Sequence, residues 1–386
     1  MRLCRIVTVP GTFQAHLRDQ LRCVVEEGIH LTLVASPGDE LDVVGREVGA
    51  ETIGVAMQRA PAPMADLRSL FLLTNVLQGG HFDIVHSTTP KAGFLTALAS
   101  TMARVPVRIH TFTGQPWVEL RGLRRWIPRQ CDRITARLAT RCYADSPSQR
   151  EFLIRERLVK PDRIGVIGAG SISGVNLDRF SAAQGGERDV IRDELGISRD
   201  AVVVIFVGRV TKDKGIVELL AAFEMASKRF PQLRLLVVGP FEPDRDPLPD
   251  KTVAGLKNNR RIHLVGFQGQ PERYLGAADI FVLPSYREGF GSVAIEAAAL
   301  GLPAIVTRIT GLTDAVVENV TGLIVPPKSP DALAEAIETL AGSRGMRQAM
   351  GEAGRQRVMK IFDARVINEA VVREYRRLAF LSQSGV

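Results

Sequence analysis

The chain has 386 residues, 45% of them hydrophobic and 24% charged, which is typical of a soluble protein long enough to fold as two domains. Its 50 Lys and Arg residues against 42 Asp and Glu residues leave a formal charge of +8, which favours anionic partners such as phosphates, acidic lipids or nucleic acid. No stretch approaches the roughly 18 apolar residues of a membrane span, and the N-terminal apolar run is too short for a signal peptide. We therefore expect a cytoplasmic protein.

Short runs rich in Val, Ile and Leu alternate with longer amphipathic stretches through the first half, as expected for parallel strands joined by helices. The predicted strands are 3–9, 31–35, 84–86, 107–111, 141–144 and 164–167. Gly11 lies in the turn after the first strand, and His110 lies within the fourth, where a lone histidine is usually a core residue. The four cysteines show no paired or zinc-type spacing, so we expect no structural metal.

A basic segment spans residues 121–141, where seven arginines face the single acid Asp132. Several of the arginines repeat at helical spacing and are interleaved with apolar residues such as Trp126 and Ile127. This surface favours peripheral contact with an anionic membrane at the inner face, although a solvated helix face is the plainer interpretation. Nucleic acid is not an expected partner, because no binding module accompanies the charge. The seven residues are Arg121, Arg124, Arg125, Arg129, Arg133, Arg137 and Arg141.

Residues 168–188 contain five glycines and several serines, a composition that resists regular structure and suits a hinge. We therefore predict an N-terminal domain over 1–180 and a second domain over 181–365. A C-terminal helix over 366–386 is expected to pack back toward the N-terminal domain.

The alternation of strands and helices returns in the second half. Strands are predicted at 202–207, 235–238, 262–265, 280–283, 304–307 and 323–325, followed by helices at 331–343 and 346–380. The pattern predicts two doubly wound, Rossmann-like α/β domains that face one interdomain cleft.

A basic turn, Gly208-Arg209-Val210-Thr211-Lys212-Asp213-Lys214-Gly215, follows strand 202–207 and precedes a helical pattern. Turns of this kind at the ends of parallel strands collect anions, because free backbone N–H groups and the positive end of a helix meet there. Arg209 can chelate a phosphate with its planar guanidinium, and Lys214 adds a second positive charge. The alternative is a solvated basic turn without a ligand.

Two carboxylates, Glu288 and Glu296, stand eight residues apart after strand 280–283. This spacing leaves Glu288 in a loop and puts Glu296 one or two turns inside an Ala-rich helix. Carboxylates accept hydrogen bonds from the vicinal hydroxyls of a ribose or hexose, while Gly289 and Gly291 allow backbone amides to approach a phosphate.

Together the two segments resemble the G-R-x-x-x-x-K-G and E-x7-E motifs of the family 4 retaining glycosyltransferases (glycosyltransferase group 1), which have the two-domain GT-B fold. The resemblance covers almost the whole chain. It implies that Arg209, Lys214 and Glu288 are catalytic, with the two cations on the donor diphosphate and Glu288 on the sugar hydroxyls, and that Glu296 binds the ribose. The implied donor-binding set is Gly11, Gly208, Arg209, Lys214, Gly266, Phe267, Glu288, Gly289, Phe290, Gly291 and Glu296.

One departure from the family pattern concerns the acceptor side. Many members carry a histidine where Thr113 stands in this sequence, so His110 and Thr113 are the candidates for acceptor or cleft contacts.

The resemblance implies metal-independent, retaining hexosyl transfer from a nucleoside-diphosphate sugar, most simply a UDP-sugar, with no cofactor. The resemblance and the basic surface together suggest a lipid-linked or polysaccharide-precursor acceptor of cell-surface glycan biosynthesis. Asp244-Arg245-Asp246 has the D-x-D form of metal-using glycosyltransferases, but positive side chains are already available for the diphosphate. A nucleotide-sugar epimerase of the same architecture and a non-catalytic nucleotide-sugar-binding subunit are the alternatives.

Overall fold

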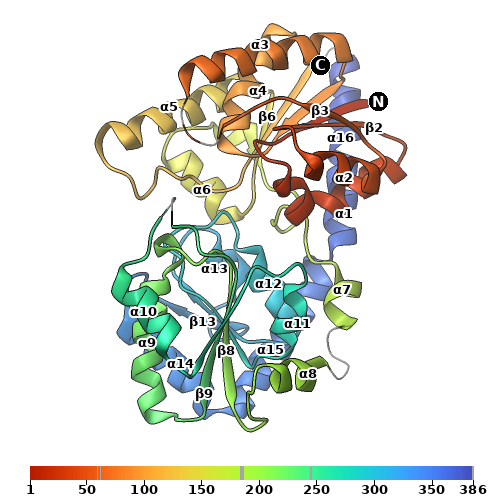
Figure 1. Ribbon diagram of the computed structural model, residues 1–386. Helices are drawn as coiled ribbons and strands as arrows, with labels where there is room; N and C mark the ends of the chain where they lie inside the picture. The colour runs from red at the N-terminus through yellow and green to blue at the C-terminus, as the bar shows by residue number, and fades with distance from the viewer. Residues whose placement is uncertain (59, 61, 183–186, 244–245, 385–386) are drawn as a thin grey trace. The chain divides into compact units, whose positions relative to one another are not determined.

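The computed structural model describes residues 1–58, 60, 62–182, 187–243 and 246–384. The chain divides into two compact units, one formed by Met1–Gly174 with Ala364–Val386 and the other by Val175–Asp363 (Figure 1). Residues 183–186 of the predicted hinge and residues 244–245 of the D-x-D segment lie outside the described residues. No described helix is long and apolar enough to cross a membrane.

The described part of the first unit contains a seven-stranded parallel sheet in the order β3-β2-β1-β4-β5-β6-β7. Its strands are β1 Arg2–Ile6, β2 His30–Ala35, β3 Glu51–Gly54, β4 Ile84–Ser87, β5 Val107–Phe112, β6 Arg141–Ala144 and β7 Ile164–Gly165. The helices are α1 Arg18–Glu26, α2 Asp39–Val48, α3 Pro63–Gly80, α4 Pro90–Met102, α5 Gly122–Leu138, α6 Pro147–Arg155 and α16 Ala364–Gln383, with the short turns η1 Phe13–Leu17 and η2 Pro161–Arg163.

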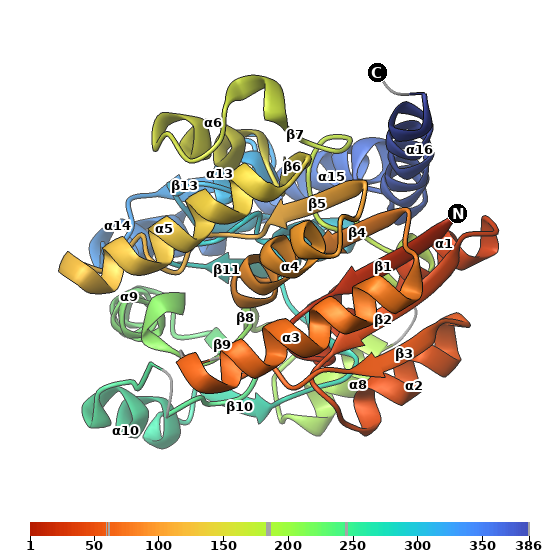
Figure 2. The same ribbon diagram turned by 90° about the horizontal axis from the view of Figure 1, so that it is seen from above.

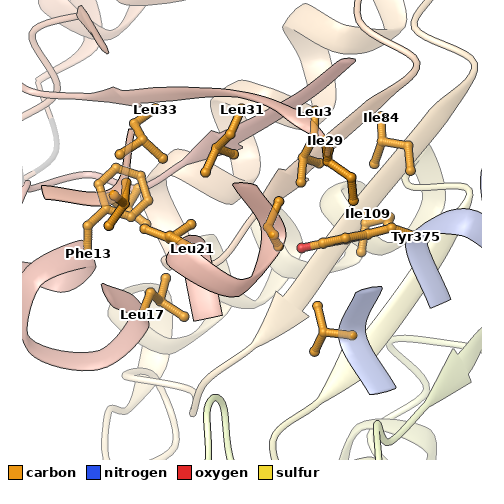
Figure 3. Close-up of a cluster of buried hydrophobic side chains, with 14 of the residues drawn as sticks. Leu3, Phe13, Leu17, Leu21, Ile29, Leu31, Leu33, Ile84, Ile109 and Tyr375 are labelled. Atoms are coloured by element: carbon orange, nitrogen blue, oxygen red, sulfur yellow. The ribbon is translucent and has the colours of Figure 1, made fainter. Parts of the chain in front are cut away.

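Successive side chains of a strand point to opposite faces of its sheet, and the first unit has a core on each face. Leu3 of β1 packs with α1, α2 and α16, in the cluster that Figure 3 shows. Its neighbour Cys4 packs instead with α3 and α4, which lie side by side with α5 (Figure 2). Helix α16 contributes Tyr375 to the first of these cores.

The second unit repeats the arrangement with a six-stranded parallel sheet in the order β10-β9-β8-β11-β12-β13 in the described residues. Its strands are β8 Val202–Val207, β9 Leu233–Val238, β10 Ile262–Gly266, β11 Ile280–Leu283, β12 Ala304–Thr307 and β13 Gly322–Val325. The helices are α7 Leu177–Ala182, α8 Glu187–Glu194, α9 Ile216–Arg229, α10 Asp250–Asn258, α11 Pro271–Gly276, α12 Ser292–Ala299, α13 Leu312–Ala315, α14 Pro330–Gly342 and α15 Arg344–Ile361, with η3 Lys212–Lys214.

Both sheets reverse their strand order once, between β1 and β4 in the first unit and between β8 and β11 in the second. Ligands of open parallel sheets bind beyond the carboxyl ends of the strands at such a switch point. In the second unit, the basic turn follows β8 and the acidic segment follows β11. The topology therefore places both predicted motifs beside each other at the switch point.

The structure differs from the sequence prediction in three elements. Helix α7 lies within residues 168–188, where no regular structure was expected. Strand β3 was not predicted, and the single helix expected at 346–380 is two helices, α15 and α16, separated at Phe362 and Asp363. The break is fixed by pairing with a distant segment, because Val175 donates its N–H to the Phe362 carbonyl at 2.8 Å and forms a bridge with Asp363.

Candidate functional site

Close backbone contacts hold the turns of the second unit together at the switch point. Gly215 has φ 73°, and a Cβ there would lie 2.1 Å from the carbonyl oxygen of Pro284. A Cβ on Gly239 would lie 1.8 Å from the carbonyl oxygen of Gly208. Because only glycine fits at such distances, the turn after β8 rests directly on the turns after β9 and β11.

This contact brings Lys214 to the loop that carries Glu288. The Lys214 Nζ lies 2.5 Å from Glu288 Oε1, and the hydroxyl of the buried Ser285 donates to the same oxygen at 2.8 Å. The two charged side chains keep 17% and 14% of their surface exposed, so the pair remains within reach of a ligand. The structure thus joins one residue of each predicted motif.

A second cluster surrounds Asp213, inside the basic turn. Arg287 and Arg209 lie 2.8 and 3.5 Å from Asp213 Oδ2, and Arg209 also pairs with Glu242 at 3.0 Å. Burial alone would raise the pKa of Asp213, but the hydrogen bond from Thr211 and the nearby cations lower it overall. The cations therefore neutralise internal carboxylates, and an anionic diphosphate could take the place of those carboxylates.

Three of these residues were missed by the sequence prediction. Asp213 stands inside the quoted basic motif and Arg287 directly precedes Glu288, so both were visible in the sequence. Their pairing joins turns that are 74 positions apart, and neither motif alone indicates it. Glu242 follows β9 and had no sequence signal.

The glycine segment after β11 leads into α12. Gly291 has φ 82°, and a Cβ there would lie 2.3 Å from Leu312 Cδ2, which explains the glycine on packing grounds. The Phe290 ring is buried against Phe362 with centroids 5.3 Å apart, so only the backbone of Phe290 can contact a ligand.

Glu296 lies inside α12, which packs against α7 and α11. Burial raises its pKa to about 7; the charge of Arg179 opposes the rise and that of Glu272 adds to it. Arg179 and Glu272 form a bidentate ion pair, with Nε 2.8 Å from Oε1 and Nη2 2.6 Å from Oε2. In the described part of the unit, no hydrogen bond or ion pair joins Glu296 to Arg209, Lys214 or Glu288.

The predicted base-contact residues lie at the end of the outer strand β10. Gly266 has φ 69° and accepts a hydrogen bond from the N–H of Gly239 at 2.7 Å. Phe267 follows with 77% of its surface exposed, which leaves an aromatic face available for stacking.

The remaining candidates belong to the first unit. A Cβ added to Gly11 would meet nothing closer than Glu40 Oε2 at 3.5 Å, so the space around this residue does not demand glycine. His110 is buried, bonds Ser87 at 2.9 Å, packs edge-on against Phe112 and fills the space beside Gly93. Burial lowers its pKa to about 3, so it is a neutral core histidine. Thr113 lies just after β5, with its hydroxyl 3.4 Å from the Thr88 carbonyl oxygen.

The basic segment forms helix α5, and several of its arginines have local partners. Arg129 pairs with Glu156 at 3.2 Å, and Arg125 lies over the Trp117 ring. Arg124 is exposed, as are Leu123, Trp126 and Ile127, with 73%, 57% and 55% of their surfaces accessible. The exposed surface is therefore a mixture of apolar and basic side chains.

The two doubly wound sheets define a protein of the GT-B fold, and cations and carboxylates gather at the switch point of the second sheet. The glycosyl transferases group 1 family matches residues 187–357, and the glycosyl transferase 4-like domain family matches residues 11–170. The chain belongs to this glycosyltransferase family.

Relatives and solved structures agree with this assignment. The capsular polysaccharide biosynthesis glycosyltransferase CapM of Staphylococcus aureus is 30% identical over 383 residues, covering 99% of this chain and 98% of the relative. The UDP-Gal:alpha-D-GlcNAc-diphosphoundecaprenol alpha-1,3-galactosyltransferase of Escherichia coli is 28% identical over 70% of each chain. HepE of Anabaena, solved with UDP and glucose, superimposes with a TM-score of 0.81 at 18% identity over 98% of this chain and all of that chain, a likeness of fold.

Proposed function

We propose that this glycosyltransferase moves a sugar from a UDP-sugar to a hydroxyl of a lipid-linked or polysaccharide-precursor acceptor in cell-surface glycan biosynthesis. The contact between Lys214 and Glu288 carries the proposal, because it joins a cation suited to a phosphate and a carboxylate suited to sugar hydroxyls at the switch point of the sheet. The names of the CapM and galactosyltransferase relatives support a glycan acceptor and a UDP-sugar donor.

Each donor group has a matching side chain in this proposal. Arg209 and Lys214 bind the diphosphate, Glu288 accepts from sugar hydroxyls, and Glu296 accepts from the ribose. The exposed Phe267 ring lies beside the base, and backbone amides of residues 289–291 approach the phosphate or sugar. Arg287 is added to the predicted set, because it shares Asp213 with Arg209.

The proposed reaction retains the configuration of the anomeric carbon. The bond from that carbon to the diphosphate oxygen breaks as the acceptor hydroxyl attacks from the same face, and the departing phosphate takes up the acceptor proton. Arg209 and Lys214 stabilise the negative charge that grows on the diphosphate, so the reaction does not require a metal ion.

The test uses purified protein, a panel of nucleoside-diphosphate sugars and a polyprenyl-diphosphate-linked sugar acceptor, with and without EDTA. We expect UDP release that depends on the acceptor and survives EDTA, with a product whose anomeric configuration by NMR matches the donor. A donor converted to an isomeric nucleotide sugar without acceptor would indicate an epimerase. Donor binding with no turnover across the panel would indicate the non-catalytic subunit.

We also propose that α5 holds the enzyme at an anionic membrane, where a lipid-linked acceptor resides. The mixed apolar and basic surface of Leu123, Arg124, Trp126 and Ile127 supports this, because apolar side chains enter the interface while arginines attract acidic lipids. In co-sedimentation with phosphatidylglycerol vesicles, Arg124→Ala should weaken binding by roughly fivefold, since one basic residue contributes about 1 kcal/mol. The exposed Arg260 of the second unit gives a matched control, and equal losses for both variants would refute a specific role for α5.

A further inference from the structure

A small cavity of about 20 Å³ lies within the first unit. The strands supply Arg5, His86 and Thr111 to its wall, and Asp145 joins them just after β6. Its lining also includes Gln20, Tyr143, Ala144, Ile167, Ser171, Ile172 and Val371. None of these residues belongs to the proposed donor site, which lies in the second unit.

Two residues of this lining each carry a buried polar atom with no hydrogen-bond partner among the described residues: Nε of Arg5 and Oδ1 of Asp145. Arg5 is 1% exposed and Asp145 is 7% exposed, so bulk water does not satisfy them. Arg5 Nε is a donor, and the Asp145 carboxyl, whose pKa burial raises to about 8, keeps an oxygen that can accept. A buried donor or acceptor without a hydrogen bond destabilises the fold, and one small molecule that both donates and accepts would supply the missing hydrogen bonds. The cavity volume matches one water molecule.

Residues 168–174 border the cavity and are held by hydrogen bonds to Asp145 and Gln20. Ser171 donates its N–H to the Asp145 carbonyl at 2.7 Å, and Gln20 Nε2 donates to the Ile172 carbonyl at 2.8 Å. Ser171 has φ 70°, a left-handed conformation that a serine keeps only when its surroundings hold it there. This segment ends at Gly174, where the chain leaves the first unit.

The chain returns to the first unit at Ala364, and the helix that begins there also borders the cavity. Val371 of α16 contributes to the lining. Tyr375, one turn further along α16 (Figure 3), accepts a hydrogen bond from Arg5 at 2.5 Å and lies 2.6 Å from His86 Nδ1. Both connections between the units thus lead directly from this cavity.

We infer that the cavity is a specific binding site for one water molecule, which donates to Asp145 Oδ1 and accepts from Arg5 Nε. The water joins β1 to the turn after β6, and through their bonded neighbours it steadies residues 168–174 and the start of α16. The site is a structural part of the first unit and is separate from donor binding.

A high-resolution crystal structure of the full chain tests the occupant. We expect a well-ordered water within about 2.7–3.2 Å of both Arg5 Nε and Asp145 Oδ1. An empty cavity, or a water that contacts neither atom, would overturn the inference.

Hydrogen exchange tests the effect on the two connections. Asp145→Leu removes the acceptor, keeps the branching of the side chain at Cγ, and should speed exchange of the amides of residues 168–174 and of the first turns of α16 by roughly tenfold. Asp145→Asn keeps an acceptor oxygen and should exchange nearly as the wild type does. Equal effects of Leu and Asn would argue against a bridging water.

A matched control uses another buried carboxylate of the first unit, Asp132, which accepts from the Trp117 indole at 2.6 Å and does not line the cavity. Asp132→Leu should speed exchange around α5 and leave residues 168–174 unchanged. If it speeds exchange of residues 168–174 as Asp145→Leu does, the effect is general destabilisation and the inference fails. Neither measurement involves sugar transfer, so the result is independent of the proposed function.

Discussion

The two units carry polar clusters on sheets of the same strand order, but the clusters differ in charge and burial. In the first unit, the buried Arg5 bonds neutral partners: Gln20, His86, Thr88 and Tyr375. Burial and the charge of Arg5 lower the pKa of His86, which keeps that ring neutral. In the second unit, Arg209, Lys214 and Arg287 pair with carboxylates at partly exposed positions.

The difference teaches which cluster can exchange partners. The ion pairs of the second unit keep part of their surface exposed, and a diphosphate that displaces Asp213 or Glu288 supplies the cation with a new anionic partner. A buried donor or acceptor that loses its partner costs about 1–3 kcal/mol, so the Arg5 cluster is fixed. We therefore expect substitutions in the second unit to change activity and substitutions in the first to change stability.

The largest effect on activity should come from Lys214→Ala. Turnover should fall by about a hundredfold or more, because a preorganised cation on the leaving diphosphate is lost. The free energy of unfolding should change little. Steady-state UDP release and urea unfolding measure the two quantities, and Lys228→Ala on the exposed side of α9 is the control. A folded Lys214→Ala enzyme with wild-type turnover would remove Lys214 from the site.

Tyr375→Phe should have the opposite effect, with a loss of stability and little change in turnover. The change removes one of the partners of Arg5 Nη1 and the contact with His86 Nδ1, which should lower the free energy of unfolding by about 1–3 kcal/mol. Urea unfolding followed by circular dichroism gives the value. Unchanged stability would mean that the buried network is not fixed as the comparison requires.

Arg287→Ala would sharpen the comparison, because only the structure places this residue with the motif. We expect turnover to fall roughly tenfold, less than for Lys214, since loss of one charge-assisted contact near the surface costs about 1.5 kcal/mol. Steady-state UDP release measures the loss. A matched Arg308→Ala variant, which breaks a surface pair with Glu318, should leave turnover unchanged.

Glu296 offers the smallest and most specific test, through pH. Its pKa is raised from 4.5 to about 7, so the folded protein holds a proton there that the unfolded chain releases. The stabilising contribution is therefore full below about pH 4.5 and is lost as the pH rises through about 7. Glu296→Gln should remove this part of the stability profile in thermal unfolding at a series of pH values. An identical profile in the variant would contradict the raised pKa.

Most of the fold could be predicted from the sequence because its strands are buried on both faces and appear as continuous apolar runs. Strands β8, β11 and β12 match their predicted bounds. Strand β3 was missed because it is a short outer strand that begins with the exposed Glu51 and ends with Gly54. A C-terminal helix over 366–386 was expected, but the helical pattern over 346–380 did not indicate the break at Phe362 and Asp363, because that break depends on pairing with Val175, a contact that no local pattern records.

The candidate site was predictable in its residue types and less so in its geometry. The motifs indicated Lys214 and Glu288, which the structure brings into contact. They did not indicate that Asp213 gathers Arg209 and Arg287, or that the Phe290 side chain faces the core. Those features depend on which strand ends lie beside each other, and no single motif predicts the strand order.

The backbone contact of Gly215 with Pro284 has a consequence for how related enzymes could change their substrates. The two loops that carry Lys214 and Glu288 cannot separate or slide without losing that contact, so they move as one rigid unit. Donor binding then requires little ordering of the protein, and a side chain at position 215 would misalign both charged groups at once. Variation in donor choice should therefore arise at freer positions, of which the exposed ring after β10 is the most accessible.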